Sequence, residues 1–399
     1  MAEHAERAHA LLSASGSHRW MNCTGSPSLE KLYPDESSIY ADEGTLAHEL
    51  AELELKRALG WIGDDKEYRR ELRRIRKHDL FSLDMPRQVD KYVSVVIEKF
   101  NELVAEFGEE MVTVSIEERL DFSNYVPEGF GTGDANIISP ISLHVYDLKY
   151  GKGVPVFADE NSQLMLYGVG AYNAYELIAD IKTVTLNVVQ PRLDSFSSWD
   201  ITAEDLIEWA ETTVKPLAEI AYGGEGEFKA GDWCKWCRAK ATCRTLAERN
   251  LELAKYEFCD PNELTPAELM DVFNKLDLLG DWTNAVKDHM YKKALDGKKI
   301  EGFKLVAGRS VRKWADADAV KRALRTNGYT RSQYINSKIK GIGDISDLMS
   351  VDEFDEILGH LIIKPEGKPA LVPISDKRKE LNNAKDEFDD GFDDAEDLI

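Results

Sequence analysis

The sequence predicts an α/β fold with a mixed central sheet flanked by helices. Three observations lead to this prediction. Two helical segments lie upstream of residue 111, three short segments rich in β-branched residues follow, and an apolar helical segment separates the third of these from a fourth. An order of helices, three strands, a helix and a strand is typical of an α/β core.

The upstream helices are predicted from apolar residues that recur at helical spacing. Residues 42–60 place leucines among charged residues. In residues 88–107 the apolar positions are Tyr92, Val93, Val96, Ile97 and Phe100. Each segment therefore has an apolar face that can cover a sheet.

The core strands are predicted from alternating, β-branched sequence. The four predicted strands are residues 111–122, 131–138, 143–150 and 182–189. Residues 139–142 (SPIS) form a tight connection, and Gln190-Pro191-Arg192 ends the fourth strand. The predicted helices of this region are residues 161–177, which begin near an Asn/Ser cap, and residues 203–222.

The domain boundaries are predicted from changes in composition and hydrophobic pattern. We expect a helical N-terminal region at 1–110, a core with a cysteine cluster at 111–258, a mainly helical C-terminal extension at 259–380 and a disordered acidic tail at 381–399. The extension is expected to contain a helix at 261–295, a hairpin strand pair at 302–314 and a proline-punctuated extended stretch at 364–373.

Composition limits the possible functions. The net charge of −23 counts against a protein that binds DNA by bulk charge, although residues 66–78 and 308–314 are locally basic. No apolar run approaches the roughly 20 residues that cross a bilayer, so we expect no membrane partner. The N-terminus lacks the apolar centre of a signal peptide, and we expect a reducing cytoplasm, where the five cysteines are free thiols or metal ligands.

Two carboxylates and a lysine make the first candidate site. Asp134 closes a Gly-Thr-Gly-Asp turn within one strand, and Asp147 and Lys149 lie on the next. Alternation directs Asp147 and Lys149 to the same face. Such a group can hold a divalent metal and support phosphodiester hydrolysis. An isolated Asp-x-Lys is more often a surface pair on an edge strand.

The flanking residues resemble the PD-(D/E)xK nuclease superfamily, and within it the RecB-like branch. Gly131-Thr132-Gly133-Asp134 is similar to its G-x-x-D element and Asp147-Leu148-Lys149 to its (D/E)-x-K element, with Asp where Glu is commoner. The other elements that match are the helical histidine, His48, and the Q-x-x-x-Y pair, Gln163 and Tyr167.

The resemblance implies a fold and a set of roles. The fold is a restriction-endonuclease-like core, with Mg²⁺ or Mn²⁺ bound by His48, Asp134, Asp147 and the backbone carbonyl of Leu148. Lys149 would activate water, and Gln163 and Tyr167 would orient the DNA strand.

The cysteines form a second candidate site. Cys234, Cys237 and Cys243 are clustered, and Cys23 lies far upstream. Zinc and an iron-sulfur cluster both accept four thiolates, and spacing alone does not choose between them. Four unrelated reduced thiols is the plainer interpretation. The arrangement resembles the iron-sulfur nucleases of the AddB and CRISPR-adaptation type, which implies a [4Fe-4S] cluster that staples the chain. Cys259 is expected to be an ordinary buried thiol.

Other basic residues are weaker candidates for DNA contact, namely Lys152, Arg309, Arg312 and Lys313. Most of the chain also resembles a family of phage and prophage proteins. This implies a DNA nuclease, an exonuclease by expectation, that acts in replication, recombination or end processing in a bacterial host cell. A phage single-strand-binding or recombination protein is the expected partner. The alternatives are a non-catalytic DNA-binding or assembly subunit and a zinc-stapled interaction module.

Overall fold

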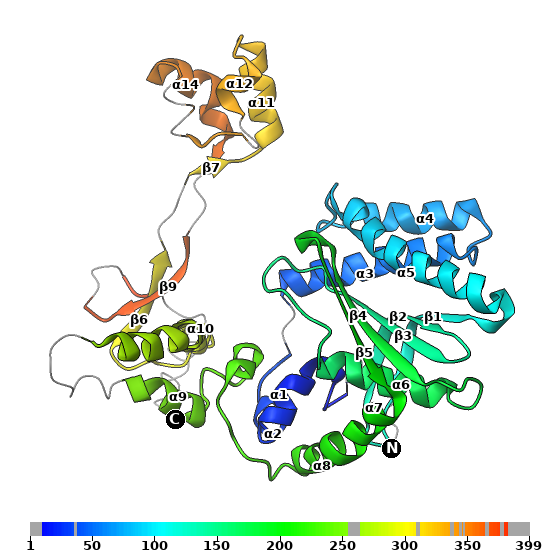
Figure 1. Ribbon diagram of the computed structural model, residues 1–399. Helices are drawn as coiled ribbons and strands as arrows, with labels where there is room; N and C mark the ends of the chain where they lie inside the picture. Colours follow the sequence, from blue (N-terminus) through cyan, green and yellow to red (C-terminus); the bar gives the residue numbers. More distant parts are fainter. Residues whose placement is uncertain are drawn as a thin grey trace, which may run out of the picture. The chain divides into compact units, whose positions relative to one another are not determined.

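A computed structural model describes residues 10–35, 38–253, 264–308, 312–335, 339–342, 345, 348–363, 367–375 and 379–381 (Figure 1). The chain packs as two compact units, residues 1–282 and 283–399. The predicted acidic tail and Cys259 lie outside the described residues.

A five-stranded mixed sheet forms the centre of the first unit; the sequence predicted a mixed sheet with four of these strands. Its strands lie in the order β1 (Thr113–Asp121), β2 (Phe130–Ile138), β3 (Ser142–Leu148), β4 (Thr183–Gln190) and β5 (Ser195–Thr202). Neighbours are antiparallel except β3 and β4, which are parallel because helix α6 provides the crossover between them. Strand β5 was not predicted; its sequence, SFSSWDIT, mixes strand-favouring Phe, Trp, Ile and Thr with three serines and an aspartate.

Helices cover both faces of the sheet (Figure 1). The helices of the first layer are α3 (Ile39–Ala58), α4 (Asp65–Arg76) and α5 (Met85–Phe107). Buried residues such as Leu50 and Tyr92 pack against Ile137 and Leu148 of the sheet. Ser38 caps α3 and Gly108, with a φ of 89°, ends α5.

The opposite face is covered by α6 (Ser162–Tyr175), α7 (Ala203–Trp209) and α8 (Lys215–Gly223). Asn161 caps α6, as the sequence predicted. The expected single helix at 203–222 is interrupted by a π-helical turn at Ala210–Val214. The side chains buried here include Leu164, Val169 and Leu206, which pack on Val184 and Leu186. Two apolar layers therefore enclose the sheet.

Short N-terminal helices meet the segment that follows α8. These are η1 (Ala14–Gly16), α1 (Ser17–Asn22) and α2 (Ser26–Glu30); the later segment holds η5 (Asp232–Trp236) and α9 (Arg244–Leu251). The Gly25 N–H donates to the carbonyl of Glu227 at 2.9 Å. The buried carboxylate of Glu30 accepts from Arg19 and from the N–H of Arg238. These bonds join segments about two hundred residues apart in sequence.

The C-terminal region contains more helices and two small sheets. Its helices are α10 (Pro266–Leu295), α11 (Ala317–Thr326), α12 (Arg331–Tyr334) and α14 (Val351–Leu358); its strands are β6 (Phe303–Gly308), β7 (Lys313–Trp314), β8 (Ile362–Ile363) and β9 (Gly367–Pro373). The predicted hairpin at 302–314 was wrong in its pairing. Strand β6 pairs with β9 and β7 with β8, so each strand finds its partner about fifty to seventy residues away in sequence rather than in its neighbour.

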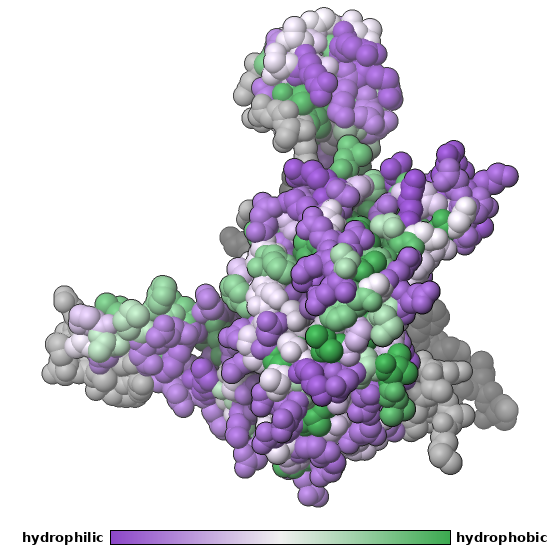
Figure 2. Space-filling view, turned by 45° about the vertical axis from the view of Figure 1, so that its right-hand side comes forward, coloured by the Kyte–Doolittle hydropathy of each residue, from purple (hydrophilic) through white to green (hydrophobic). Residues whose placement is uncertain are grey.

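The surface agrees with the charge of the chain. In Figure 2 hydrophilic residues cover most of the visible face, and apolar groups are scattered in small areas. Within the described residues, none of the helices is both long and apolar enough to cross a bilayer.

Candidate metal and cysteine sites

The two candidate aspartates lie on neighbouring strands. Asp134 is on β2 and Asp147 on β3, and the pairing of Ala135 with Tyr146 places them beside one another. The Leu148 N–H donates to the carboxylate of Asp134 at 2.6 Å. The backbone therefore fixes the direction of this carboxylate.

Lys149 lies in a polar network around the buried Asp147. Its Nζ is 2.8 Å from Asp147 Oδ2 and donates to Gln163 Oε1 at 3.1 Å. Gln163 Nε2 lies 3.3 Å from Asp147 Oδ1 and 3.2 Å from the Tyr167 hydroxyl. Burial raises the pKa of Asp147, and the charge of Lys149 opposes that rise. The i,i+4 pair on α6, Gln163 and Tyr167, thus braces Asp147 near the end of β3 and Lys149 just after it.

His48 approaches this group from α3. Its Nδ1 is 3.2 Å from Asp134 Oδ1. Burial by itself lowers the pKa of His48, but the charge and hydrogen bond of Asp134 raise the pKa to about 9. In the absence of a metal the imidazole is therefore protonated at neutral pH.

Glu117 is a further member of the group that sequence reasoning missed. It lies on β1, and its Oε1 is 3.9 Å from His48 Nδ1. Ligand atoms of His48, Glu117 and Asp134 all lie within 4.8 Å of one another. Burial, followed by the charge of Asp134, raises the pKa of Glu117 to about 7. A pair of glutamates in a strand is common, so nothing in the sequence marked Glu117 as a candidate metal ligand.

The backbone at Glu117 is strained. Its φ of 50° lies in the left-handed region, and the ladder passes directly from Ile116 to Glu118 without a partner for Glu117. Left-handed conformations of residues other than glycine cost free energy and concentrate at functional sites. The irregularity turns the Glu117 carboxylate toward His48. In a regular strand the side chain that follows Ile116 would point to the opposite face of the sheet.

Gly131 and Gly133 give the site the room it needs. A Cβ at Gly131 would lie 2.6 Å from a ring carbon of Tyr167, and one at Gly133 would lie 2.8 Å from Leu120. The Gly-Thr-Gly-Asp sequence is therefore required by close packing against α6 and β1.

The four cysteines come together at one place. Cys23, Cys234, Cys237 and Cys243 line a small pocket with Arg19 and Lys229. The first three are buried and Cys243 is partly exposed. Burial raises the pKa of Cys234, and it raises the pKa of Cys237 to about 12. Without a metal these two thiols remain protonated.

The remaining predicted residues lie elsewhere. Lys152 is exposed in the turn after β3, Arg312 and Lys313 lie in the second unit, and Arg309 lies outside the described residues. Three arginines of the basic helix α4 pair with acids: Arg69 with Asp65, and Arg70 and Arg74 with Glu71. A paired, exposed set of this kind is a solvated face. The predicted Leu148 carbonyl ligand stays a prediction.

Comparison with known proteins places the chain in a family. Residues 9–379 match the model described as "Protein of unknown function (DUF2800)", and the chain belongs to that family. A solved structure titled "Crystal structure of SSO0001" is similar over 56% of this chain and 95% of its own, with 16% identity and a TM-score of 0.21. That likeness is too low to carry an argument about function.

Proposed function

We propose that this protein is a divalent-metal-dependent DNA nuclease with a core of the PD-(D/E)xK type. The observation that supports it best is the meeting of His48, Glu117 and Asp134 next to the pair formed by Asp147 and Lys149. If the Asp-Lys pair were only an ordinary ion pair, there would be no reason for a histidine and two further carboxylates to lie beside it.

The donor set fits a hard divalent cation. Carboxylate oxygens of Asp134, Glu117 and Asp147 with one imidazole nitrogen are ligands that Mg²⁺ or Mn²⁺ accepts. Such a cation, when bound, polarises a phosphodiester and lowers the pKa of a water molecule. His48 must lose its proton to become a ligand, so metal binding displaces the charge that the imidazole now carries.

The chain's own residues supply the rest of the site. Asp147 holds the Lys149 ammonium at 2.8 Å, which keeps a positive charge beside the metal ligands. There it can position a nucleophile or stabilise negative charge that develops on phosphate. Gln163, which bonds to Lys149, Asp147 and Tyr167, fixes the direction of both charged groups.

The cysteine site fits an iron-sulfur cluster as part of the same proposal. Cys23, Cys234, Cys237 and Cys243 line one small pocket. Two of the sulfurs accept a backbone N–H, Cys23 from Lys229 at 3.4 Å and Cys234 from Gly231 at 3.5 Å. The four thiolates would hold the cluster, and hydrogen bonds to sulfur are among the factors that tune it.

The test is cleavage of end-labelled single- and double-stranded linear DNA with Mn²⁺. We expect the wild type to cut, and Lys149→Ala to cut roughly a thousandfold more slowly, because one charge-stabilising group is lost. Lys152→Ala is the matched control, since it removes an exposed lysine three residues away.

Two outcomes would contradict the nuclease proposal. One is a wild-type protein that cuts neither substrate. The other is a Lys149→Ala variant as active as Lys152→Ala. DNA binding without cleavage would identify a non-catalytic DNA-binding subunit.

A further inference from the structure

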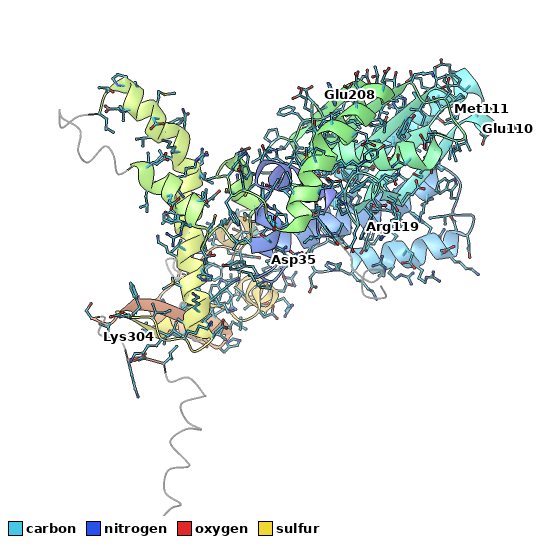
Figure 3. All side chains as sticks on the ribbon, turned by 90° about the horizontal axis from the view of Figure 1, so that it is seen from below. Asp35, Glu110, Met111, Arg119, Glu208 and Lys304 are labelled. Carbon is cyan, nitrogen blue, oxygen red and sulfur yellow. The ribbon has the colours of Figure 1, made fainter. Side chains whose placement is uncertain are left out.

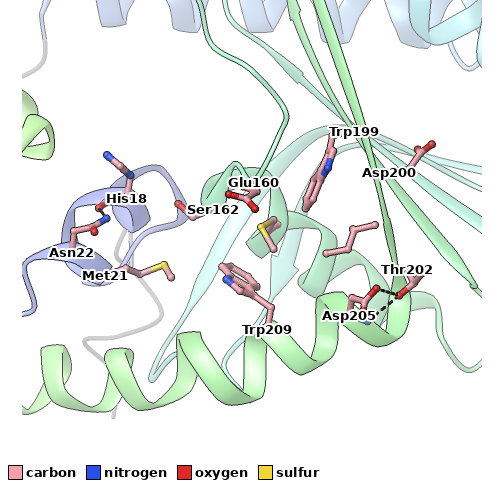
Figure 4. Close-up of a pocket in the computed structure, with 12 residues that line it drawn as sticks. His18, Met21, Asn22, Glu160, Ser162, Trp199, Asp200, Thr202, Asp205 and Trp209 are labelled. Atoms are coloured by element: carbon pink, nitrogen blue, oxygen red, sulfur yellow. Dashed lines mark hydrogen bonds between the residues drawn. The ribbon is translucent and has the colours of Figure 1, made fainter.

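A large cavity lies outside the candidate metal site. It has a volume of about 700 Å³ and is bounded by α1, the start of α6, β5 and α7 (Figure 4). Its lining residues include Met21, Met165, Trp199, Ile201 and Trp209. Gln163 of the metal site is the neighbour of Ser162, which lines the cavity, so the two regions share the first turn of α6.

The walls of the cavity are aromatic. Trp199 comes from β5 and Trp209 from α7, and both indoles are half-buried. In Figure 4 Glu160 lies on the same side of β5 as the two indoles, just before α6, whereas Asp200 points away from them. Indole faces attract cations more strongly than other aromatic rings do.

The charged lining residues are acidic. Glu160, Asp200 and Asp205 contribute carboxylates, and no lysine or arginine is among the lining residues. Asp205 is engaged in the first turn of α7, because the hydroxyl of Thr202, the N-cap residue, donates to its carboxylate at 2.6 Å. Glu160, which is exposed, gives the mouth its charge, whereas Asp200 accepts a hydrogen bond from Thr185 at 2.7 Å. Phosphate-bearing ligands are repelled by such a rim, and organic cations are attracted.

The cavity reaches the edge of the sheet. Strand β5 is the last strand and is bonded only to β4 among the described strands. Trp199 and Ile201 face the α6 layer, and Asp200 must face the other way because strand side chains alternate. Four successive residues of β5, from Trp199 to Thr202, line the cavity, so it runs along this edge strand, where an extended peptide can pair.

We propose that this cavity and the adjoining edge of β5 bind an extended segment of a partner protein that inserts a lysine or arginine side chain. The charged end lies between Trp199 and Trp209 and is paired with Glu160. The peptide backbone hydrogen-bonds to the β5 edge. This site is independent of the proposed nuclease chemistry.

The test measures anisotropy of a labelled, capped short peptide in which threonine and valine alternate around a central arginine, bound to the full-length chain. A citrulline peptide, which keeps the shape of arginine without its charge, is the ligand control. We expect the arginine peptide to bind roughly tenfold more tightly than the citrulline peptide. Glu160→Gln is expected to remove most of that difference.

Two further variants complete the test. Trp209→Leu removes an aromatic wall and is expected to weaken binding roughly tenfold. Glu208→Gln is the matched control, because it changes an exposed acid next to Trp209 that does not line the cavity (Figure 3). An unchanged melting temperature of Glu160→Gln separates lost binding from lost folding.

Three results would overturn the proposal. The first is equal binding of the arginine and citrulline peptides. The second is full displacement of the peptide by spermidine with the same Glu160 dependence, which would assign the site to a free polyamine. The third is displacement by oligothymidylate that depends on Trp209, which would make the cavity a nucleobase site.

Discussion

The metal site and the cysteine site of this chain are built in opposite ways. The side chains of the candidate metal site neutralise one another's charge, because Asp134 pairs with His48 and Asp147 pairs with Lys149. The cysteine site instead collects four thiols around a small pocket, and burial raises the pKa of Cys234 and Cys237. The charges of the first site are paired within the site, whereas the four thiols of the second include no opposite charges and depend on hydrogen bonds of neighbouring residues, such as those of Glu30.

From this difference we expect the two sites to have different roles. A site with internal ion pairs can lose and regain a cation without loss of the fold. Thiols contributed by Cys23 and by residues 234–243 join distant segments, so the free energy of a bound group there is also free energy of folding. We therefore expect an exchangeable, catalytic cation at the first site and a permanent, structural group at the second.

Removal of one cysteine should give the largest effect on stability. Cys234→Ser is expected to lower the melting temperature by roughly 10 °C or more, because the stapling group is lost. Absorbance near ~400 nm, with iron and sulfide analysis of anaerobically prepared protein, reports the cluster. A colourless wild type that contains one zinc would reject the cluster and favour a zinc staple.

Metal chelation should separate the two sites. We expect brief EDTA treatment to abolish DNA cleavage and added Mn²⁺ to restore it, while the visible absorbance and the melting temperature stay unchanged. The reason is that carboxylate ligands release a hard cation readily and buried thiolates hold their group. Cleavage that survives EDTA would show that the first site holds no exchangeable catalytic cation.

A pH experiment should report the titration of a buried histidine that belongs to neither site. His144 on β3 is buried, and burial, with a smaller effect of Lys99, lowers its pKa to about 4. The unfolded chain binds the proton from about pH 6.5 downward, so stability is complete above that pH and falls as the pH drops toward 4. We expect about 2 kcal/mol to be lost between pH 7 and pH 5.

The measurement for His144 is urea unfolding at both pH values. His144→Gln is expected to reduce the loss by that amount. Ser142 Oγ lies 3.1 Å from His144 Nε2, so Ser142→Ala serves as a control that changes the contact but keeps the titrating ring. Equal pH dependence in all three proteins would show that other groups control acid unfolding.

The smallest expected effect concerns Glu117. Glu117→Gln should weaken Mn²⁺ binding about tenfold by calorimetry, because one charged ligand is lost. Glu118→Gln is the matched control, since Glu118 accepts from the Tyr175 hydroxyl rather than facing His48. Equal Mn²⁺ affinity of the two variants would remove Glu117 from the ligand set.

The sequence by itself determined the layered α/β order and the central strands. It did so because apolar periodicity records which face of an element is buried. Spacing on neighbouring strands also singled out Asp134, Asp147 and Lys149, while resemblance to known families added His48, Gln163, Tyr167 and the set of four cysteines.

Only the tertiary structure decided the rest. Strand β5 forms because β4 offers it an edge, and its own composition does not require a strand. Glu117 joins His48 through a local irregularity in β1, and Trp199 and Trp209 share a cavity through the packing of α7 on β5. Such contacts depend on where separate elements meet, which local sequence patterns do not encode.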